Sequence, residues 1–252
     1  MSTFAEFAQK NLVPLMPLVF VLVVLSQALL KVIKTFFIRP KINVYPTGPL
    51  SIGLSQLGST LTLFGTLQVQ RGDCFVTKME AFVWNNTWSR TFEWRALQPY
   101  TFSLLPNQEN LQLELVSAFL LTTQAPFKYN LVFVDDRLTK QCMPEVLKLR
   151  QRWEDAGQPD ITAFMEKEEA VAHLLTRLQQ EWYWQPGAYQ LTLKIHTARK
   201  IHEKTYQFEL TQAQLTALQG NFIKLAKLIC DQPVKFDKVK CEYHQGYSAE
   251  AK

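Results

Sequence analysis

The chain has 252 residues, of which 47% are hydrophobic, and a formal net charge of +5 at pH 7. Its excess charge is unevenly distributed, because five of the 27 basic residues and one of the 22 acidic residues precede position 42. Residues 42–252 therefore carry 22 basic and 21 acidic side chains, a net charge of +1. Binding to a nucleic-acid backbone depends on a concentrated positive surface. This nearly balanced composition argues against a nucleic-acid partner.

An uncharged apolar segment lies close to the N-terminus. The nineteen residues from Leu12 to Leu30 carry no charge. A helix of that length rises about 28 Å, close to the hydrocarbon thickness of a bilayer. We therefore expect a single transmembrane helix over residues 12–33, preceded by a short interfacial segment over residues 1–11.

Two other interpretations of this segment remain open. A helix buried in a soluble core would also be apolar, although such helices usually keep a polar face. A cleaved signal peptide would place its cleavage site near the small residues Ser26 and Ala28. Against cleavage, apolar residues continue past this point and several cations follow them.

The cations that follow the segment predict its orientation. Lys31, Lys34, Arg39 and Lys41 lie on its C-terminal side, with no acidic residue among them. Cytoplasmic flanks of membrane helices carry an excess of Lys and Arg. We therefore expect these four residues to lie at the membrane interface against anionic head groups. The rest of the chain is expected in the cytoplasm.

Two polar side chains interrupt the apolar segment. Ser26 and Gln27 lie in its second half. An amide in hydrocarbon is costly unless a neighbouring helix offers a hydrogen-bond partner. We expect these two residues to form a helix-association face, so that self-association through the anchor is one expected interaction.

Beyond a basic linker and edge strand over residues 34–58, the pattern becomes that of β-strands. Apolar side chains recur at every second position, which is typical of half-buried strands. The segments with this alternation are 59–70, 74–84, 87–97, 111–123, 128–135, 189–197, 204–210 and 234–244. Short strands separated by Gly, Pro and Asn favour an antiparallel sandwich.

The period changes to three or four residues in two places. Apolar residues over 136–183 predict two amphipathic helices, separated at 157–159 and with Asp160 as the N-cap of the second. A third helix begins at Thr211, where Gln214 completes a capping-box pattern.

The expected fold is mainly β with α. An N-terminal transmembrane helix precedes an immunoglobulin-like antiparallel β-sandwich over residues 59–244. The sandwich carries a helical-pair insertion at about 136–183, and a C-terminal helix plus strand complete it. Residues 245–252 are polar and are expected to form a flexible tail.

The sequence gives no positive reason to propose catalysis. The four histidines lack metal-ligand spacing, although His196 and His202 flank a predicted hairpin turn. The four cysteines form no CxxC pair and are expected to be small core residues in a reducing compartment. No P-loop, nucleophile elbow or HExxH pattern is present. We therefore predict no catalytic, cofactor-binding or metal-ligating residue.

Clustered aromatic residues point instead to a protein partner. Trp182, Tyr183 and Trp184 are consecutive, and adjacent residues of a strand face opposite ways. We therefore expect some of them to be exposed, and we name Trp182, Trp184 and Trp88 as partner-binding candidates.

The predicted function is a membrane-anchored, non-enzymatic binding or scaffold protein that presents its β-sandwich to a partner protein at the cytoplasmic membrane face. Two alternatives remain open. One is an enzyme or small-molecule binder with its site between the helical insertion and the sandwich. The other is an extracytoplasmic envelope protein with the same anchor.

Overall fold

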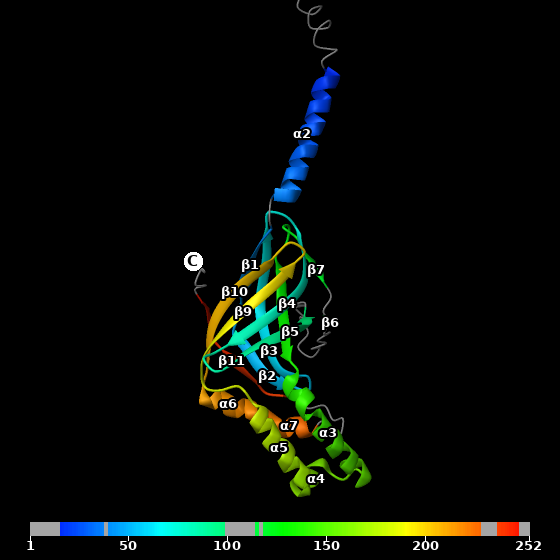
Figure 1. Ribbon diagram of the computed structural model, residues 1–252, viewed down its shortest axis with the longest axis vertical. Coiled ribbons are helices and arrows are strands. Elements are labelled where there is room, and N and C mark those ends of the chain that lie inside the picture. Colours follow the sequence, from blue (N-terminus) through cyan, green and yellow to red (C-terminus); the bar gives the residue numbers. More distant parts are fainter. Residues whose placement is uncertain (1–15, 38–39, 99–113, 116–117, 228–235, 247–252) are drawn as a thin grey trace, which may run out of the picture.

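The computed structural model describes residues 16–37, 40–98, 114–115, 118–227 and 236–246. Within them the fold is mainly antiparallel β with helices (Figure 1). The strands are β1 (Lys41–Pro46), β2 (Leu50–Ser55), β3 (Gly58–Gln70), β4 (Cys74–Trp84), β5 (Ser89–Gln98), β6 (Glu114–Leu115), β7 (Phe119–Leu121), β8 (Phe127–Asp135), β9 (Gly187–Thr197), β10 (Ile201–Leu210), β11 (Lys238–Cys241) and β12 (Tyr243–Gln245).

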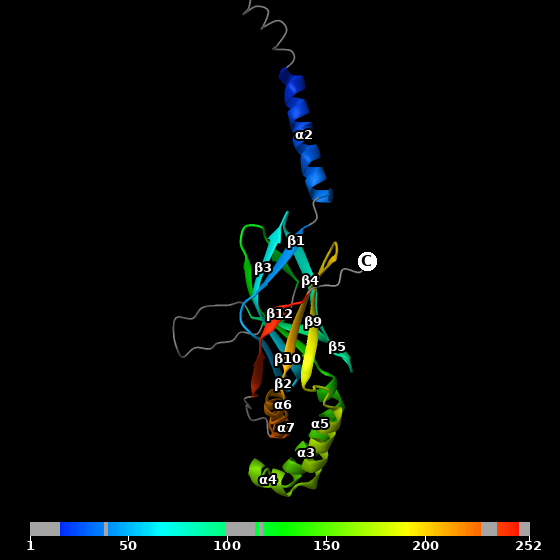
Figure 2. The ribbon, with the colours of Figure 1, turned by 90° about the vertical axis from the view of Figure 1, so that its left-hand side faces the viewer.

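These strands belong to one sheet rather than to two packed sheets. Its order is β11-β2-β3-β8-β5-β4-β9-β10-β12, with β1 on β3, β6 on β5 and β7 on β4. The sheet curls into a nearly closed barrel (Figures 1 and 2). The expected immunoglobulin-like sandwich is therefore not confirmed. Sandwiches and barrels both bury alternate residues of each strand, so alternation does not distinguish them.

A single short segment spans the seam of this barrel. β11 pairs with β2, and β12, two residues later, pairs with β10 at the other end of the sheet order. The sequence pattern predicted one continuous strand over 234–244. The structure instead divides the described part of this segment between two neighbours, with Glu242 between the two strands.

The barrel interior contains the larger hydrophobic core. Its buried residues alternate along each strand, and the largest fully buried side chains include Tyr129, Tyr189, Phe92 and Phe133. Gly65 is required on β3 by close packing, because a Cβ atom there would lie 2.4 Å from the Tyr129 hydroxyl oxygen. β1 and β2 pair with β3 on either side of this region, joined by residues 47–49.

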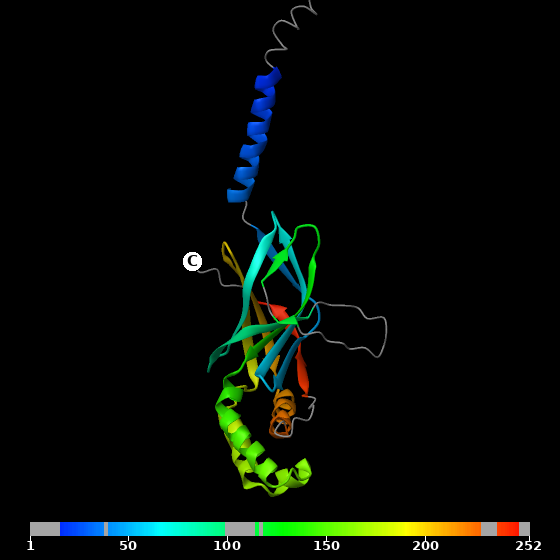
Figure 3. The same cartoon turned by 90° about the vertical axis from the view of Figure 1, so that its right-hand side faces the viewer.

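A second core lies beneath one end of the barrel, where helices cover it (Figures 2 and 3). These helices are α3 (Arg137–Asp155), α4 (Ile161–Lys167), α5 (Glu169–Glu181), α6 (Gln212–Gln219) and α7 (Asn221–Lys227). We call them the helical cap. The Thr211–Gln214 capping box is present at the start of α6, and Asp160 caps α4 through the backbone N–H groups of Thr162 and Ala163.

Helix α2 (Met16–Phe37) extends from the opposite end of the barrel (Figures 1 and 3). Its described side chains, at residues 20–30, are exposed. Of the helices in the described part of the chain, none combines the length and apolar character needed to cross a bilayer. The transmembrane helix expected over 12–33 stays a prediction, and residues 1–11 lie outside the described residues.

Candidate functional site

The barrel end that the helical cap covers is closed by polar side chains. Ser59, Arg90 and Asp135 are the last inward-facing residues of β3, β5 and β8, and Ser59 lies directly opposite Asp135 in the strand register. Two positions further into these strands the side chains are Leu61, Phe92 and Phe133, all in the barrel core. The inward faces of three adjacent strands thus change from apolar to polar at this end.

Tyr183, which follows α5, lies against these polar residues. The Arg90 guanidinium carbon is 5.1 Å from the centre of the Tyr183 ring. Burial, and then the nearby charge of Asp135, raise the pKa of the Tyr183 hydroxyl well above its usual value, so the phenol stays protonated. The Asp135 carboxylate accepts a hydrogen bond from the Arg137 guanidinium at 3.0 Å. These contacts tie the start of α3 and the segment after α5 to the barrel.

The three tryptophans predicted to bind a partner lie in or beside the two cores. Trp184 is 2% exposed. Trp88 packs edge-on against Trp184, with ring centres 5.2 Å apart, and Trp182 packs edge-on against Phe222 at 5.1 Å. The chain here runs between barrel and cap, where Trp88, Trp182 and Tyr183 are partly buried. The burial of Trp184 argues against it as a partner-binding residue, whereas the partly buried Trp88 and Trp182 stay predictions.

The cap itself carries a small apolar hollow of about 170 Å³. It is lined by Gln56, Thr139, Cys142, Met143, Val146, Leu147, Arg150 and Leu225. Met143 and Leu147 are 39% and 57% exposed at its rim. Most of the lining lies on one face of α3, because these positions are three or four residues apart. This hollow is the candidate functional site.

Cys142 lies at the base of the hollow and is buried. Burial raises the pKa of its thiol to about 11. A thiol is nucleophilic as its thiolate, so Cys142 contributes an apolar surface here and does not supply a reactive group at neutral pH.

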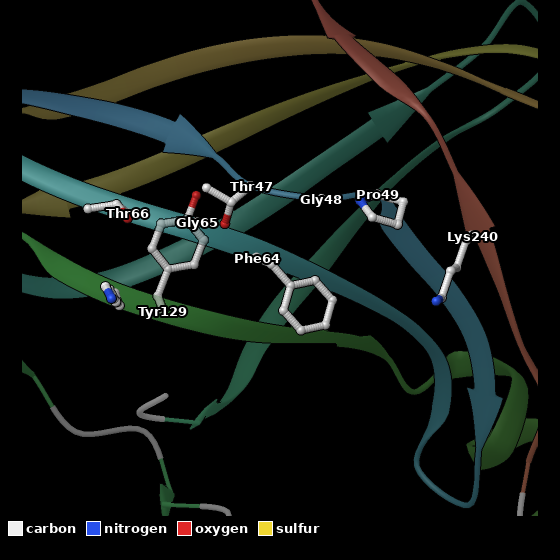
Figure 4. Close-up of a pocket in the computed structure, with 9 residues that line it drawn as sticks. Thr47, Gly48, Pro49, Phe64, Gly65, Thr66, Tyr129 and Lys240 are labelled. Atoms are coloured by element: carbon white, nitrogen blue, oxygen red, sulfur yellow. The ribbon is translucent and has the colours of Figure 1, made fainter. Parts of the chain in front are cut away.

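A larger groove of about 470 Å³ lies on the side of the barrel (Figure 4). It forms where the chain passes from β1 to β2 through Thr47, Gly48 and Pro49, and the backbone N–H of Thr47 donates to the Phe64 carbonyl at 2.9 Å. The other lining residues are Gly65, Thr66, Lys128, Tyr129 and Lys240. The hydroxyl of Tyr129 stays protonated, because burial raises its pKa.

The residues predicted at the membrane lie at the other end of the molecule. The Ser26 hydroxyl donates to the Val23 carbonyl at 2.8 Å, within its own helix, and Gln27 is exposed. Lys41 begins β1 and is exposed. The side chains of Lys31 and Lys34, and all of Arg39, lie outside the described residues.

The histidines and carboxylates do not gather into a metal site in the described ranges, where no group of three or more potential ligands is found. His196 lies 2.9 Å from a Glu80 carboxylate oxygen on the neighbouring strand β4, not facing His202 across the hairpin. Cys74 and Cys241 are buried and free, like Cys142.

The comparisons with known proteins give no relative: no family model, no curated protein and no solved structure matches this chain. The site therefore has to be interpreted from its own geometry. Sequence reasoning missed Met143 and Leu147. The signal in the sequence was that Met143 and Leu147 directly follow the apolar positions Cys142 and Val146 of the predicted helix.

Proposed function

We propose that this protein is a membrane-anchored, non-enzymatic binding module that displays the capped end of its barrel to a partner protein. The observation that carries this proposal is the placement of α2 and the helical cap at opposite ends of the barrel (Figure 1). A chain attached to a bilayer through α2 would hold the cap away from the lipid.

The anchor is supported by the sequence and by the exposed face of α2. The uncharged stretch from Leu12 to Leu30 begins before the described residues. Phe20 is 70% exposed, and Leu22 and Leu29 are about as open to the surroundings. Contiguous apolar surface of this kind marks a contact with membrane or protein. The basic residues after the span favour a cytoplasmic barrel beside anionic lipid.

The binding role is supported by the hollow in the cap. Ligand pockets for small molecules usually enclose about 300–1,000 Å³, and this hollow is smaller. A single apolar side chain from a protein fits it better. Met143 adds an adaptable, polarisable contact surface at the rim. The partner we propose therefore inserts an apolar side chain between Met143 and Leu147.

The test uses the full chain extracted in mild detergent, after cross-linking in cells. Leu147→Asp places a charge at the rim of the hollow, and we expect it to abolish the main cross-linked partner. Gln141→Asp is the matched control, because it adds the same charge at another exposed position of α3. Equal recovery of the same partners by both variants would contradict the proposed surface.

The location of the barrel is tested separately. A reporter fused after Lys252 should be active on the cytoplasmic side, and the chain should resist extraction from membranes by carbonate. A reporter active only outside the cytoplasm would favour the envelope-protein alternative, whereas complete release by carbonate would contradict the anchor.

A further inference from the structure

The barrel end nearest α2 is formed by tight turns. We call it the anchor-side end and define it by the start of β1 and the turns at 71–73, 122–126 and 198–200. The strand register brings these together. Lys41 lies opposite Gln70, Cys74 opposite Leu121, and Val76 opposite Thr197.

This end carries an excess of exposed positive charge. Lys41, Arg71, Arg199 and Lys200 are exposed, and none of them forms an ion pair with another described residue. The acidic residue of these turns, Asp73, accepts hydrogen bonds from the backbone N–H and the hydroxyl of Thr123, at 2.8 and 3.2 Å. Its carboxylate joins two turns, and its single negative charge against the four cations leaves this end with a net charge of +3.

Exposed apolar side chains accompany these cations. Phe75 and Leu120 are 48% and 52% exposed and lie opposite each other on β4 and β7. Ile201, the first residue of β10, is 50% exposed. Basic residues beside bulky apolar ones are the combination that binds the interface of an anionic bilayer.

The chain length between helix and barrel keeps this end close to the end of α2. Three residues separate Phe37 from Lys41. Even fully extended, the chain from one to the other reaches about 14 Å. Lys41, and the turn that begins after its register partner Gln70, therefore stay near the end of α2.

We propose that the anchor-side end of the barrel is itself a lipid-binding surface, which rests on an anionic bilayer through Lys41, Arg71, Arg199, Lys200 and the adjacent apolar side chains. The inference depends on the proposed membrane anchor. It adds a second contact, which would set the orientation of the barrel and aim the helical cap away from the lipid.

The test places a fluorescent probe on the full chain in vesicles with bromine-labelled lipid tails, which quench nearby fluorophores. The probe is attached at Ala125→Cys, in the turn between β7 and β8, and the distal control at Ala156→Cys, after α3. The unsubstituted chain gives the background from its native cysteines. Vesicles contain either phosphatidylcholine alone or phosphatidylcholine with phosphatidylserine.

We expect quenching at position 125 to rise about twofold or more when phosphatidylserine is present, because anionic lipid attracts the turn cations. Added salt should reverse the rise. Arg199→Gln with Lys200→Gln should remove most of it. Lys148→Gln with Lys167→Gln, which removes two exposed cations from the helical cap, should leave it unchanged. The probe at position 156 should respond to neither lipid.

Two outcomes would overturn the inference in different ways. If the chain floats with the vesicles but the probe at position 125 is quenched equally with and without phosphatidylserine, the lipid-binding surface is wrong and the anchor stands. If the chain does not float with either vesicle, the anchor fails and the inference fails with it.

Discussion

The strands of the barrel end in different surroundings at its two ends. At the anchor-side end the strands close in short turns, and the side-chain link between turns runs from Asp73 to Thr123. At the capped end the polar residues Ser59, Arg90 and Asp135 are covered by Tyr183 and by helices. A buried polar group has to be compensated by its neighbours, whereas exposed cations and apolar side chains remain available to the surroundings. We therefore expect the capped end to contribute more to stability through its packed aromatic side chains, such as Trp184, and the proposed lipid contact to depend on the anchor-side end.

The largest expected effect is the difference in stability between two variants that each replace an aromatic residue by alanine, one at each end of the barrel. Trp184→Ala removes a fully packed indole, and we expect a loss of about 3–5 kcal/mol in the free energy of unfolding. Phe75→Ala removes an exposed ring, and we expect a change within about 0.5 kcal/mol. Urea unfolding of the full chain in detergent measures both. Similar losses in the two variants would contradict the contrast between the ends.

A smaller effect is the pH dependence of stability, to which a histidine near the anchor-side end contributes. His202, near the anchor-side end, lies on the face of β10 that also carries the buried Tyr206 and Phe208. Burial, with a further contribution from the Lys200 charge, lowers its pKa from 6.5 to about 4. The unfolded chain thus binds a proton that the folded protein does not, and stability is lost as pH falls from 6.5 towards 4.

We expect His202→Gln to reduce this loss by on the order of 1 kcal/mol after allowance for solvent screening. The free energy of unfolding at pH 7 and pH 5 measures it, with the exposed His244→Gln as control. Glu80, whose pKa is lowered first by a hydrogen bond from Lys78, adds a loss below pH 4.5 in every variant. An unchanged dependence between pH 7 and pH 5 in His202→Gln would exclude this histidine as its source.

The smallest expected effect tests whether the anchor also contacts a second copy. Gln27→Leu removes the amide from the exposed face of α2, and we expect self-association to weaken by about 0.6 kcal/mol, roughly a threefold shift. Cross-linking of the full chain at several protein-to-lipid ratios measures the dimer fraction. Val24→Leu serves as control because it keeps the helix apolar. A dimer fraction that is the same in both variants would argue against association through Gln27.

The sequence predicted local structure well where a residue pattern is compatible with a single secondary structure. The alternation over 74–84 corresponds to β4, where the alternate residues Met79, Ala81 and Val83 are buried. A register irregularity between 76 and 78 shifts the pattern, so that Val76 is buried and Phe75 is exposed. The capping box at Thr211 is likewise confirmed. Both depend on interactions within a few residues, which the sequence displays directly.

What the sequence did not predict depends on contacts between distant segments. Alternation of apolar and polar residues predicts that a strand buries one face, but it does not predict which strand pairs with it. The sequence therefore predicted a sandwich where the structure has a barrel. Trp184 is buried by barrel residues from distant strands, and the nearby Trp182 packs against both cores. For the same reason the exposure of Leu147 was missed, since nothing in α3 alone shows which part of its apolar face stays uncovered.

The seam of the barrel has a consequence for the order of assembly. A ribosome makes every other described strand before residues 238–245, yet this segment joins the two ends of the sheet order. Until it emerges, the nascent sheet has two open edges, and such edges invite pairing with other chains. During synthesis the chain is therefore a substrate for chaperones until residues 238–245 have emerged. Termination before residue 238 would leave both edges of the sheet permanently open.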